Sequence, residues 1–572
     1  MRTVFQYIRP KAGMMAFEML IKLTGTVIEL LLPWMLSVIL DDYVPLGDLH
    51  GIFLWGGLMI LTAGVAFLCN AFANYISCAT SRDITRKLRG DLFSKVASLS
   101  CAQEDEITVP SLISRLTSDT YNVHQMIDRM QRLGIRAPIL LLGGIAMTFM
   151  MEPVLTLVLA AILPLLGLLV FFVSRNGIRL YTRTQEALDL MVRRTKESIA
   201  GIRVIQALSK TEYEENMFDA SNSEVVNRDQ KAAMLMNVTN PMMNLILNAG
   251  LTLVIVVGAY RVNAGLTRPG TVIAFLSYFT IILNALMMVS RLFVVYSKGA
   301  AGARRIAEVL DAPEELLPMQ LLETGNEEDD AEISFENVSF SYGKIEDNIK
   351  NINFSIRKGE TLGIIGPTGS GKSTIMNLLL RFYDPDSGVI RIRGRDIRSM
   401  QKSELHGIFG VVFQNDFIYS DDIEGNIRFG REGISDEDIR QAIESAQASF
   451  IYEKKDGLSE QLASRGSNLS GGQRQRVLLS RAFAGDPEIL LLDDSSSALD
   501  YKTDSMLRKA LSKKYGSVTK IIIAQRISSI KNADRILVLS EGCEVGSGTH
   551  EELMRSCESY REIARIQMGE VD

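Results

Sequence analysis

Histidine, cysteine and tryptophan are scarce in this sequence, with four, five and two copies among 572 residues. The five cysteines form no CxxC pair and show no regular spacing, which predicts free thiols in a reducing compartment and excludes a disulfide-stapled chain. Basic residues do not outnumber acidic ones, and the net charge of −6 argues against nucleic acid as the main partner. Hydrophobic residues make up 47% of the chain, which excludes a disordered protein.

Long apolar runs are present, and they are concentrated in the first part of the chain. Six stretches approach or exceed the roughly 20 residues that a helix needs to cross a bilayer. They cover residues 13–40, 51–77, 134–151, 153–174, 242–262 and 270–295. The sequence therefore predicts an α-helical membrane domain over residues 1–310, with six spans in a lipid bilayer.

The distribution of lysine and arginine predicts the orientation of these spans. Basic residues precede the first span and recur through the connections 78–133 and 175–241, whereas the connection 41–50 and the turn at Glu152 contain none. Only an arrangement with both termini in the cytoplasm keeps the basic connections on one side, with Arg261 and Arg268 as minor exceptions. We expect a multi-pass protein of the cell membrane whose second half lies in the cytoplasm.

The two long basic connections are themselves helix-like. Residues 76–99 and 180–217 carry charges at helical spacing and almost no glycine or proline, so the spans are expected to continue into the cytoplasm. Short segments near 104–116 and 201–213 interrupt them. By pattern alone, a solvated helical hairpin explains these connections as well as a functional role does.

Three charged residues fall inside the first span. Glu18, Lys22 and Glu29 are spaced so that all three lie on one stripe of a helix. Charges inside a membrane usually face a bundle interior or a wet cavity, which suggests a translocation pathway along this stripe. For Glu18 and Lys22, snorkelling to the inner interface is an equally good explanation.

The second half of the chain reads as an ordinary globular domain. An acidic segment over 311–330 is predicted to be a linker, and residues 331–572 are predicted to form an α/β domain. A short apolar strand over 361–365 leads into the pattern GxxxxGK[ST], and a helix over 375–381 follows. The residues of this P-loop are Gly366, Pro367, Thr368, Gly369, Ser370, Gly371, Lys372, Ser373 and Thr374.

The P-loop predicts binding of a nucleotide with Mg²⁺. Its glycines allow backbone N–H groups to surround phosphates, and Lys372 is placed to reach the β and γ oxygens. The Ser373 hydroxyl is placed for Mg²⁺. A second apolar strand, 489–492, ends in Asp493 and Asp494, and an aspartate at such a strand end is the expected partner of the Mg²⁺ ion.

At this point the chain resembles the ATP-binding cassette exporters, specifically half-transporters that fuse six membrane helices to one nucleotide-binding domain. The most specific match is the family signature, formed by Leu469, Ser470, Gly471, Gly472 and Gln473. Tyr342 matches the aromatic residue that stacks on adenine, and Gln414 matches the loop residue that senses Mg²⁺ and contacts the membrane domain. Ser497 and Asp500 belong to a match of the loop that bridges two nucleotide-binding domains.

The resemblance implies the fold and the assembly. The expected fold class is a helical membrane domain followed by a P-loop α/β nucleotide-binding domain. Two such domains sit head to tail in this family, and each ATP lies between the P-loop of one chain and the signature of the other. The short segments near 104–116 and 201–213 would be the coupling helices that dock on these domains.

Two residues depart from the family pattern at the site of hydrolysis. The family usually has glutamate after the strand-end aspartate, where this chain has Asp494, one methylene shorter. It usually has histidine after the next strand, where this chain has Gln525, which cannot become cationic or relay a proton. Two losses beside an unaltered signature resemble the degenerate half of a heterodimeric exporter.

The sequence thus predicts ATP-driven export of small amphipathic substrates, drug-like or lipid-like, by alternating access. The expected partner is a second half-transporter with the glutamate, the histidine and an altered signature. ATP would be hydrolysed slowly at this chain's own P-loop, and its signature would act on the partner's ATP. The alternative is a membrane nucleotide sensor or ATP-gated channel that does not pump, because family members with degenerate sites include such proteins.

Overall fold

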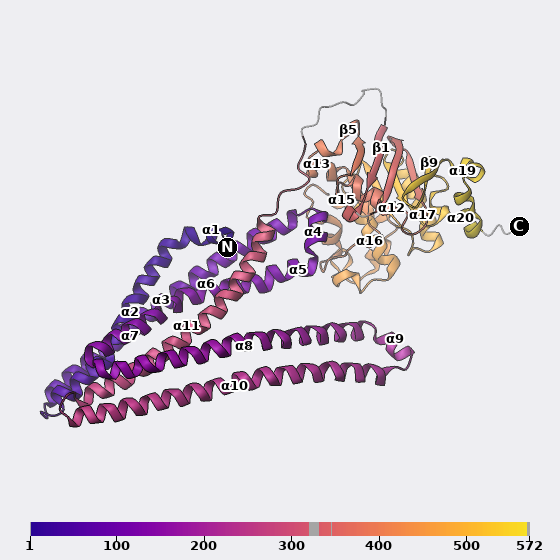
Figure 1. Cartoon of the computed structure of the whole chain (residues 1–572). Helices are drawn as coiled ribbons and strands as arrows, with labels where there is room; N and C mark the ends of the chain where they lie inside the picture. Colours follow the sequence, from indigo (N-terminus) through magenta and orange to yellow (C-terminus); the bar gives the residue numbers. More distant parts are fainter. Residues whose placement is uncertain (1, 320–330, 345, 569–572) are drawn as a thin grey trace. The chain divides into compact units, whose positions relative to one another are not determined.

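The computed structural model describes residues 2–319, 331–344 and 346–568 (Figure 1). The chain divides into two compact units. The first comprises Met1–Ala97 and Val109–Ala312, and the second comprises Ser98–Thr108 and Pro313–Asp572. Each unit is described by itself.

The first unit is entirely helical. Six helical stretches in the described residues are long and apolar enough to cross a membrane, which confirms the predicted membrane domain. The helices of this unit are α1 (Arg2–Ile8), α2 (Ala12–Val38), α3 (Leu49–Ser98), α5 (Val109–Ser114), α6 (Thr120–Gly134), α7 (Arg136–Met151), α8 (Pro153–Ala200), α9 (Ile202–Ala207), α10 (Thr211–Asn263) and α11 (Pro269–Leu310). Some of them are continued by a short 3-10 helix, η1 (Arg9–Lys11), or by short π-helical segments, η2 (Ile39–Tyr43) and η3 (Arg115–Asp119).

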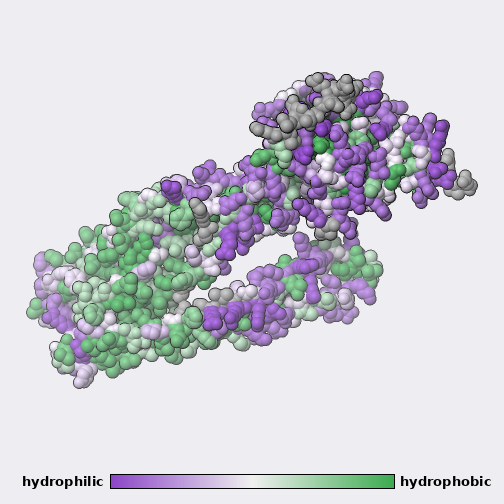
Figure 2. Space-filling model, turned by 45° about the horizontal axis from the view of Figure 1, so that its top comes forward, coloured by the Kyte–Doolittle hydropathy of each residue, from purple (hydrophilic) through white to green (hydrophobic). Residues whose placement is uncertain are grey.

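Several of these helices are much longer than a bilayer requires. Helix α3 has 50 residues and α10 has 53, which correspond to roughly 75–80 Å at 1.5 Å per residue, against a hydrocarbon core of about 30 Å. Helices α8 and α10 run side by side and are joined by the short α9 (Figure 1). Apolar side chains gather over one end of the unit, and polar ones cover the helical extensions (Figure 2).

The apolar end has a packed core. It is formed by α2, α7, α8, α10 and α11, and it includes Leu140, Phe275 and Ile282. Small residues allow these helices to approach closely, since a Cβ added at Gly144 would lie 2.7 Å from Ile282 Cγ1. The buried Tyr278 hydroxyl donates to the Leu30 carbonyl, so its polar tip is satisfied inside the bundle.

The second unit is the predicted α/β domain with two sheets. One sheet has the order β2-β1-β4-β5, and the other has the order β10-β9-β3-β8-β7-β6. The strands are β1 (Ala331–Phe340), β2 (Ile349–Arg357), β3 (Thr361–Ile365), β4 (Ser387–Ile392), β5 (Arg395–Asp396), β6 (Phe409–Val412), β7 (Ile489–Asp493), β8 (Thr519–Ile523), β9 (Arg535–Ser540) and β10 (Cys543–Gly548).

Helices pack around the six-stranded sheet, and α4 also belongs to this unit although it precedes the membrane-domain helix α5 in sequence. The helices of this unit are α4 (Cys101–Ile107), α12 (Lys372–Leu379), α13 (Lys402–Gly407), α14 (Ile423–Arg428), α15 (Asp436–Ser445), α16 (Gly471–Phe483), α17 (Tyr501–Lys514), α18 (Ile527–Ile530), α19 (His550–Ser556) and α20 (Glu558–Met568).

The topology of the six-stranded sheet positions the site. Strands β3, β8 and β7 are adjacent and parallel, with Ile364 paired to Ile523 and Ile523 paired to Asp493. Their carboxyl ends therefore meet at one edge, where ligands bind in open α/β sheets. Strand β7 is buried along its whole length, as its apolar run predicts.

The predicted linker over 311–330 is only partly within the described residues, because 320–330 lie outside them. Residues 313–319 belong to the second unit. There the Leu317 carbonyl accepts a hydrogen bond from Arg381 Nη2 at 3.1 Å, and the Met319 N–H donates to the Arg398 carbonyl at 2.8 Å.

Candidate nucleotide-binding site

The P-loop connects β3 to α12, and its backbone conformation requires glycine at several positions. Gly369 and Gly371 have φ angles of 84° and 94°, in the left-handed region that favours glycine. A Cβ added at Gly366 would lie 2.1 Å from the Leu539 carbonyl oxygen, closer than real atoms approach. The loop conformation therefore depends on residues that the motif specifies.

Lys372 begins α12 and folds back over the loop. Its Nζ donates to the carbonyl oxygens of Gly366 at 2.9 Å and Pro367 at 2.7 Å. Burial lowers the pKa of Lys372, while the nearby carboxylates of Asp493 and Asp494 act in the opposite direction. The P-loop thus presents its one ammonium group next to two carboxyl groups.

Ser373 and Asp493 are in direct contact. Ser373 lies on α12, which follows β3, and Asp493 ends β7 at the same edge of the sheet. The Ser373 hydroxyl donates to Asp493 Oδ2 at 2.9 Å. Asp493 is buried, and this burial raises its pKa. Gln414 lines the same pocket. A hydroxyl, a carboxylate and an amide are the hard oxygen donors that Mg²⁺ prefers, so these three residues fit the ion.

Asp494 and Gln525, the two departures from the family pattern, also touch each other. Gln525 Nε2 donates to Asp494 Oδ2 at 3.3 Å. The backbone of Asp494 is fixed on both sides, because its N–H donates to the Ile523 carbonyl at 2.9 Å and its carbonyl accepts from Gln475 Nε2 at 3.0 Å. Burial raises the pKa of Asp494. The sequence placed both residues at the site but did not predict their contact.

These side chains line one cavity of about 220 Å³. Its lining is formed by Asn348, Thr368, Gly369, Gly371, Lys372, Ser373, Thr374, Gln414, Asp493, Asp494, Ile523 and Gln525. Asn348 was missed by sequence reasoning, and no motif marks it. It precedes β2, and its Oδ1 accepts a hydrogen bond from the Tyr342 N–H at 2.8 Å.

Tyr342, the residue expected to stack on adenine, lines a different cavity of about 530 Å³. Its ring packs edge-on against Phe340 and Tyr383, with centroids 4.9 Å and 5.1 Å away. Its hydroxyl accepts a hydrogen bond from Asn377 Nδ2 at 3.0 Å. Because Asn377 lies on α12, Tyr342 is tied to the P-loop helix although it does not line the P-loop cavity itself.

The signature lies at the start of α16. Ser470 caps this helix, since its hydroxyl accepts from the Gln473 N–H while Gln473 Oε1 accepts from the Ser470 N–H. Leu469 is buried and Gly472 lies near Ala498, whereas Gly471 lines a cavity of about 490 Å³. Within this chain, the signature and the P-loop therefore face separate cavities, and Gln414 lines both.

Ser497 and Asp500 follow β7 and stabilise their own loop. The Ser497 hydroxyl donates to the Asp494 carbonyl at 3.0 Å. Asp500 caps α17, because its carboxylate accepts from the N–H and the hydroxyl of Thr503. Ser497 also lines the signature cavity. This loop thus joins the end of β7 to the neighbourhood of the signature.

Helix α4 docks within the second unit. Tyr383 donates its hydroxyl hydrogen to Asp105 Oδ2 at 2.7 Å. Ser100 caps α4, and its hydroxyl also donates to Glu315 at 2.5 Å. Gln103 Nε2 donates to the Pro313 carbonyl at 2.9 Å. Of the short segment predicted near 104–116, only the part up to Thr108 belongs to this unit, and α5 belongs to the first.

The second predicted short segment, near 201–213, contains α9 of the first unit. Gly201 separates α8 from α9, and Ser209, at φ 53°, ends the connection before α10 begins at Thr211. No residue of α9 itself is buried. Ile202 and Val204 are exposed apolar side chains on this helix.

The three charges of the first span lie on α2 in different surroundings. Glu18 and Lys22 are 0% and 1% exposed, so neither side chain reaches the surface of this unit. Lys22 Nζ donates to Asn74 Oδ1 at 2.8 Å, and Arg136 Nη2 donates to Glu29 at 2.9 and 3.0 Å. Among the described residues, the carboxylate oxygens of Glu18 have no hydrogen-bond partner.

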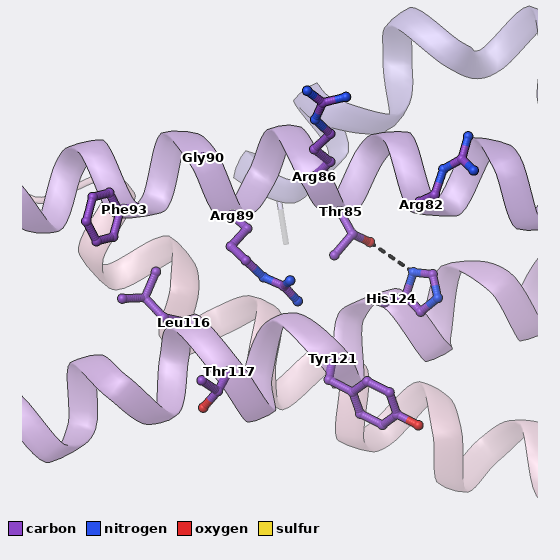
Figure 3. A pocket seen from close by; sticks show the side chains of 10 residues that line it. All are labelled: Arg82, Thr85, Arg86, Arg89, Gly90, Phe93, Leu116, Thr117, Tyr121 and His124. Atoms are coloured by element: carbon purple, nitrogen blue, oxygen red, sulfur yellow. Dashed lines mark hydrogen bonds between the residues drawn. The ribbon is translucent and has the colours of Figure 1, made fainter.

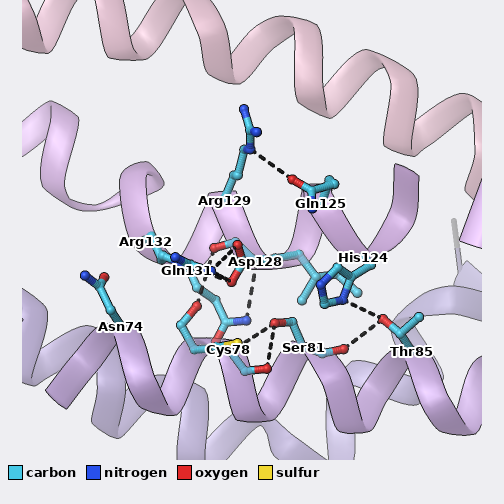
Figure 4. Close-up of polar contacts among 12 residues, drawn as sticks. Asn74, Cys78, Ser81, Thr85, His124, Gln125, Asp128, Arg129, Gln131 and Arg132 are labelled. Carbon is cyan, nitrogen blue, oxygen red and sulfur yellow. Dashed lines mark hydrogen bonds and ion pairs between the residues drawn. The ribbon is translucent and has the colours of Figure 1, made fainter. Parts of the chain in front are cut away.

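A polar ladder between α3 and α6 borders these charges. Arg132 binds both carboxylate oxygens of Asp128 (Figure 4). Asn74, the hydrogen-bond partner of Lys22, lies on α3 beside this ladder. Ser81 and Thr85 bond to carbonyls one turn earlier on α3 (Figure 4). Thr85 also contacts His124 (Figure 3). The stripe on α2 therefore belongs to a wider polar network inside the helical unit.

Comparison with known proteins extends over the whole chain. The profile described as "ABC transporter transmembrane region" matches residues 15–286, and the profile described as "ABC transporter" matches residues 349–497. The uncharacterized ABC transporter ATP-binding protein YfiB of Bacillus subtilis is 32% identical, covering 100% of this chain and 99% of that protein. The uncharacterized protein Rv1273c of Mycobacterium tuberculosis is 31% identical, covering 98% and 97%.

A solved structure shares the fold. The structure of a bacterial Atm1-family ABC exporter with ATP bound superposes with a TM-score of 0.80, covering 99% of both chains at 22% sequence identity. This likeness confirms the predicted fold class of a helical membrane domain followed by an α/β domain. Together with the profile matches and the relatives at 31–32% identity, it leads to one conclusion. The chain belongs to the ABC transporter family as a half-transporter, with one membrane region and one ATP-binding domain.

Proposed function

We propose that this half-transporter is the degenerate half of a heterodimeric exporter, which uses ATP to move small amphipathic substrates across the cell membrane by alternating access. Membership of the family implies ATPase-coupled transport. The observation that carries the finer proposal is the contact between Asp494 and Gln525 at the P-loop. Both residues are changed from the family pattern, and both line the cavity that holds Lys372 and Ser373.

The geometry of this pair favours slow hydrolysis. Aspartate places its carboxylate about 1.5 Å further from an attacking water than glutamate would, and catalytic hydrogen bonds tolerate little misplacement. The Gln525 amide donates to the same carboxylate, so one of its acceptor positions is already used. Gln525 can bind a phosphate oxygen as a neutral donor, but it cannot supply a positive charge or a proton.

The remaining residues of the cavity retain the means to bind nucleotide. Lys372 and the P-loop N–H groups would bind the phosphates, and Ser373, Asp493 and Gln414 would hold Mg²⁺. The ion supplies positive charge to the phosphate oxygens when it is bound. A site that binds ATP and hydrolyses it slowly is the expected result.

The separation of the signature from the P-loop supports a paired assembly. The signature faces a cavity of its own, so this chain needs a second chain to complete either site. We infer that the partner has glutamate and histidine at the two changed positions and an altered signature. This chain's signature would then act on the partner's ATP, at the site that hydrolyses rapidly.

The compartment of the nucleotide-binding domain follows from the basic connections and from α4. Helix α4 lies in the connection between two spans, and it forms one compact unit with residues 313–572. The connection and the nucleotide-binding domain must therefore share one side of the membrane. The excess of lysine and arginine in this connection favours the cytoplasm for both, and for both termini.

The test begins with the partner. Mild affinity purification from the native cell, followed by mass spectrometry, should recover a second half-transporter with the predicted motifs. In the purified pair, Asp494→Asn should change ATP turnover only mildly, whereas the matching change in the partner should abolish it. A homodimer of this chain that hydrolyses ATP as fast as the pair would refute the proposed asymmetry.

Export itself is tested separately. Inverted vesicles that contain the pair should accumulate a fluorescent amphipathic dye against its gradient when ATP is added. Vesicles that contain the partner's inactive variant serve as the control. ATP binding without any ATP-dependent accumulation would instead favour a nucleotide sensor or a gated channel.

A further inference from the structure

The turn between β8 and α18, which carries Gln525, is held by a residue of the last helix. Gln567 lies on α20, 42 residues after Gln525. Its side-chain amide spans the turn, because Oε1 accepts from the Ile527 N–H at 2.8 Å and Nε2 donates to the Gln525 carbonyl at 2.7 Å. One side chain therefore fixes the backbone on both sides of Arg526.

Gln567 supplies what the start of α18 lacks. The N–H groups in the first turn of a helix have no partner within that helix, and a polar residue just before it usually provides an acceptor. The residue before α18 is Arg526, whose side chain makes no capping hydrogen bond. The acceptor comes instead from Gln567 on α20. The position of the turn thus depends on a distant helix.

Helix α20 is itself fixed on the domain. Tyr560 and Ala564 are 0% and 1% exposed, and they pack in one apolar cluster with Ile527 of α18. The Tyr560 hydroxyl also lies 2.7 Å from His550 Nδ1. Tyr560, Ala564 and Gln567 are spaced by four and three residues, so they share one face of α20. The packed face of this helix therefore carries Gln567 to the turn.

The side chain of Gln525 points from this turn into the nucleotide site. It lines the P-loop cavity with Lys372, and its Nε2 donates to Asp494 Oδ2 at 3.3 Å. The proposed function puts the terminal phosphate of ATP and its attacking water beside Asp494. The Gln525 amide has two N–H donors, so it can bind Asp494 and a phosphate oxygen together. ADP lacks the terminal phosphate and cannot use this donor.

We propose that Gln567 is a positioning residue, which holds Gln525 in place and thereby sets the preference of this site for ATP over ADP. Gln567 lies outside the lining of the P-loop cavity, so it acts through the turn and not on the nucleotide. The proposal rests on ATP binding at this P-loop, as proposed above. It does not depend on a heterodimer or on the rate of hydrolysis.

The test compares the affinities for two nucleotides. The purified full chain, with any chain that co-purifies, is titrated in a calorimeter with Mg²⁺ and either ADP or AMP-PNP, an ATP analogue that is not hydrolysed. The P-loop lysine of a co-purifying chain is replaced, so that only the site of this chain binds nucleotide. The variants are Q567A and Q567M, since methionine keeps the length of the side chain without its hydrogen bonds. The matched control is E562A, because Glu562 is an exposed residue of the same helix.

Both Gln567 variants should bind AMP-PNP about three- to tenfold more weakly, while their affinity for ADP stays unchanged. A hydrogen bond from Gln525 to a charged phosphate contributes about tenfold, which limits the effect. The two neutral hydrogen bonds that hold the turn contribute about fivefold each, so their loss is enough to displace it. E562A should match the wild type. A purely structural role of Gln567 would instead lower both affinities together.

A double-mutant cycle identifies the route of the effect. In a Q525A background, Q567A should have almost no further effect on AMP-PNP affinity, because the side chain through which it acts is absent. Three results would overturn the proposal: an unchanged affinity for AMP-PNP in Q567A, an equal loss for both nucleotides, or an undiminished effect in the Q525A background. A wild type that binds neither nucleotide would refute the proposed function as well, so the two failures are distinguishable.

Discussion

The contact between Tyr383 and α4 yields a prediction whose size can be derived from the structure. The Tyr383 hydroxyl donates to Asp105 Oδ2 at 2.7 Å, and Asp105 is exposed to solvent. A hydrogen bond to a charged group contributes about 1.5–3 kcal/mol, and solvent reduces this figure at an exposed acceptor. Tyr383→Phe should therefore weaken the docking of α4 by about 1–1.5 kcal/mol, which corresponds to roughly five- to twelvefold.

Hydrogen–deuterium exchange of the full chain measures this change directly. Amide protection in α4, residues 101–107, should fall about five- to twelvefold in Tyr383→Phe. Tyr452→Phe is the matched control, because Tyr452 is an exposed tyrosine of the same unit. In transport assays of the assembled exporter, Tyr383→Phe should lower the amount of substrate moved per ATP hydrolysed while the KM for ATP stays near that of the wild type.

A double-mutant cycle provides the refutation. In an Asp105→Ala background the hydrogen bond is already absent, so Tyr383→Phe should have almost no further effect on protection. An effect of equal size in both backgrounds would mean that the aromatic packing of Tyr383, and not its hydroxyl, holds the helix. Unchanged protection in the single variant would show that this contact does not stabilise docking.

Three further predictions concern the nucleotide-binding domain. The double variant Asp494→Glu/Gln525→His should raise the rate of single-turnover ATP hydrolysis at this P-loop about 10²-fold, the usual effect of a well-placed general base. The rate is measured in a pair whose partner site is inactive, and an unchanged rate would contradict the proposed degeneracy. Burial raises the pKa of Asp493, and protons compete with metal for a carboxylate. On acidification, the Mg²⁺-dependent affinity for ATP, measured by calorimetry, should therefore begin to fall at a higher pH than it would with an aspartate of ordinary pKa. Asp493→Asn should remove this pH dependence. Asp384→Ala should destabilise the domain by about 3 kcal/mol, because Arg381 is 1% exposed and bonds to Asp384 at 2.9 Å; an unchanged calorimetric transition of the full chain would refute this.

Much of the nucleotide site could be predicted from the sequence, because its residues form contiguous motifs. The P-loop residues lie within nine positions, and the φ angles of Gly369 and Gly371 are local requirements that the sequence satisfies directly. The contact of Asp494 with Gln525 could not be predicted from the sequence, because it depends on β7 and β8 being neighbours in the sheet. Asn348 was missed for the same reason, since it reaches the cavity from the start of a strand in the other sheet.

In the membrane half, too, local features could be predicted from the sequence and tertiary contacts could not. The spacing of Glu18, Lys22 and Glu29 predicted a shared face of one helix, which is a property of the helix itself. Whether that face is open or covered depends on the other helices, and the structure buries Glu18 and Lys22 while Glu29 binds Arg136. The division of the segment 104–116 between two units likewise depends on contacts with distant residues such as Tyr383.

The cysteine pattern excluded a disulfide-stapled chain, the apolar runs indicated the six spans, and the P-loop and the signature indicated the family and the fold class. These features need only residues close together in the chain, because helix periodicity and loop conformation are local. Tertiary structure alone decided that Gln525 donates a hydrogen bond to Asp494 and that Tyr383 donates one to Asp105 of α4. Such contacts depend on strand order and helix packing, which bring together side chains that are distant in sequence.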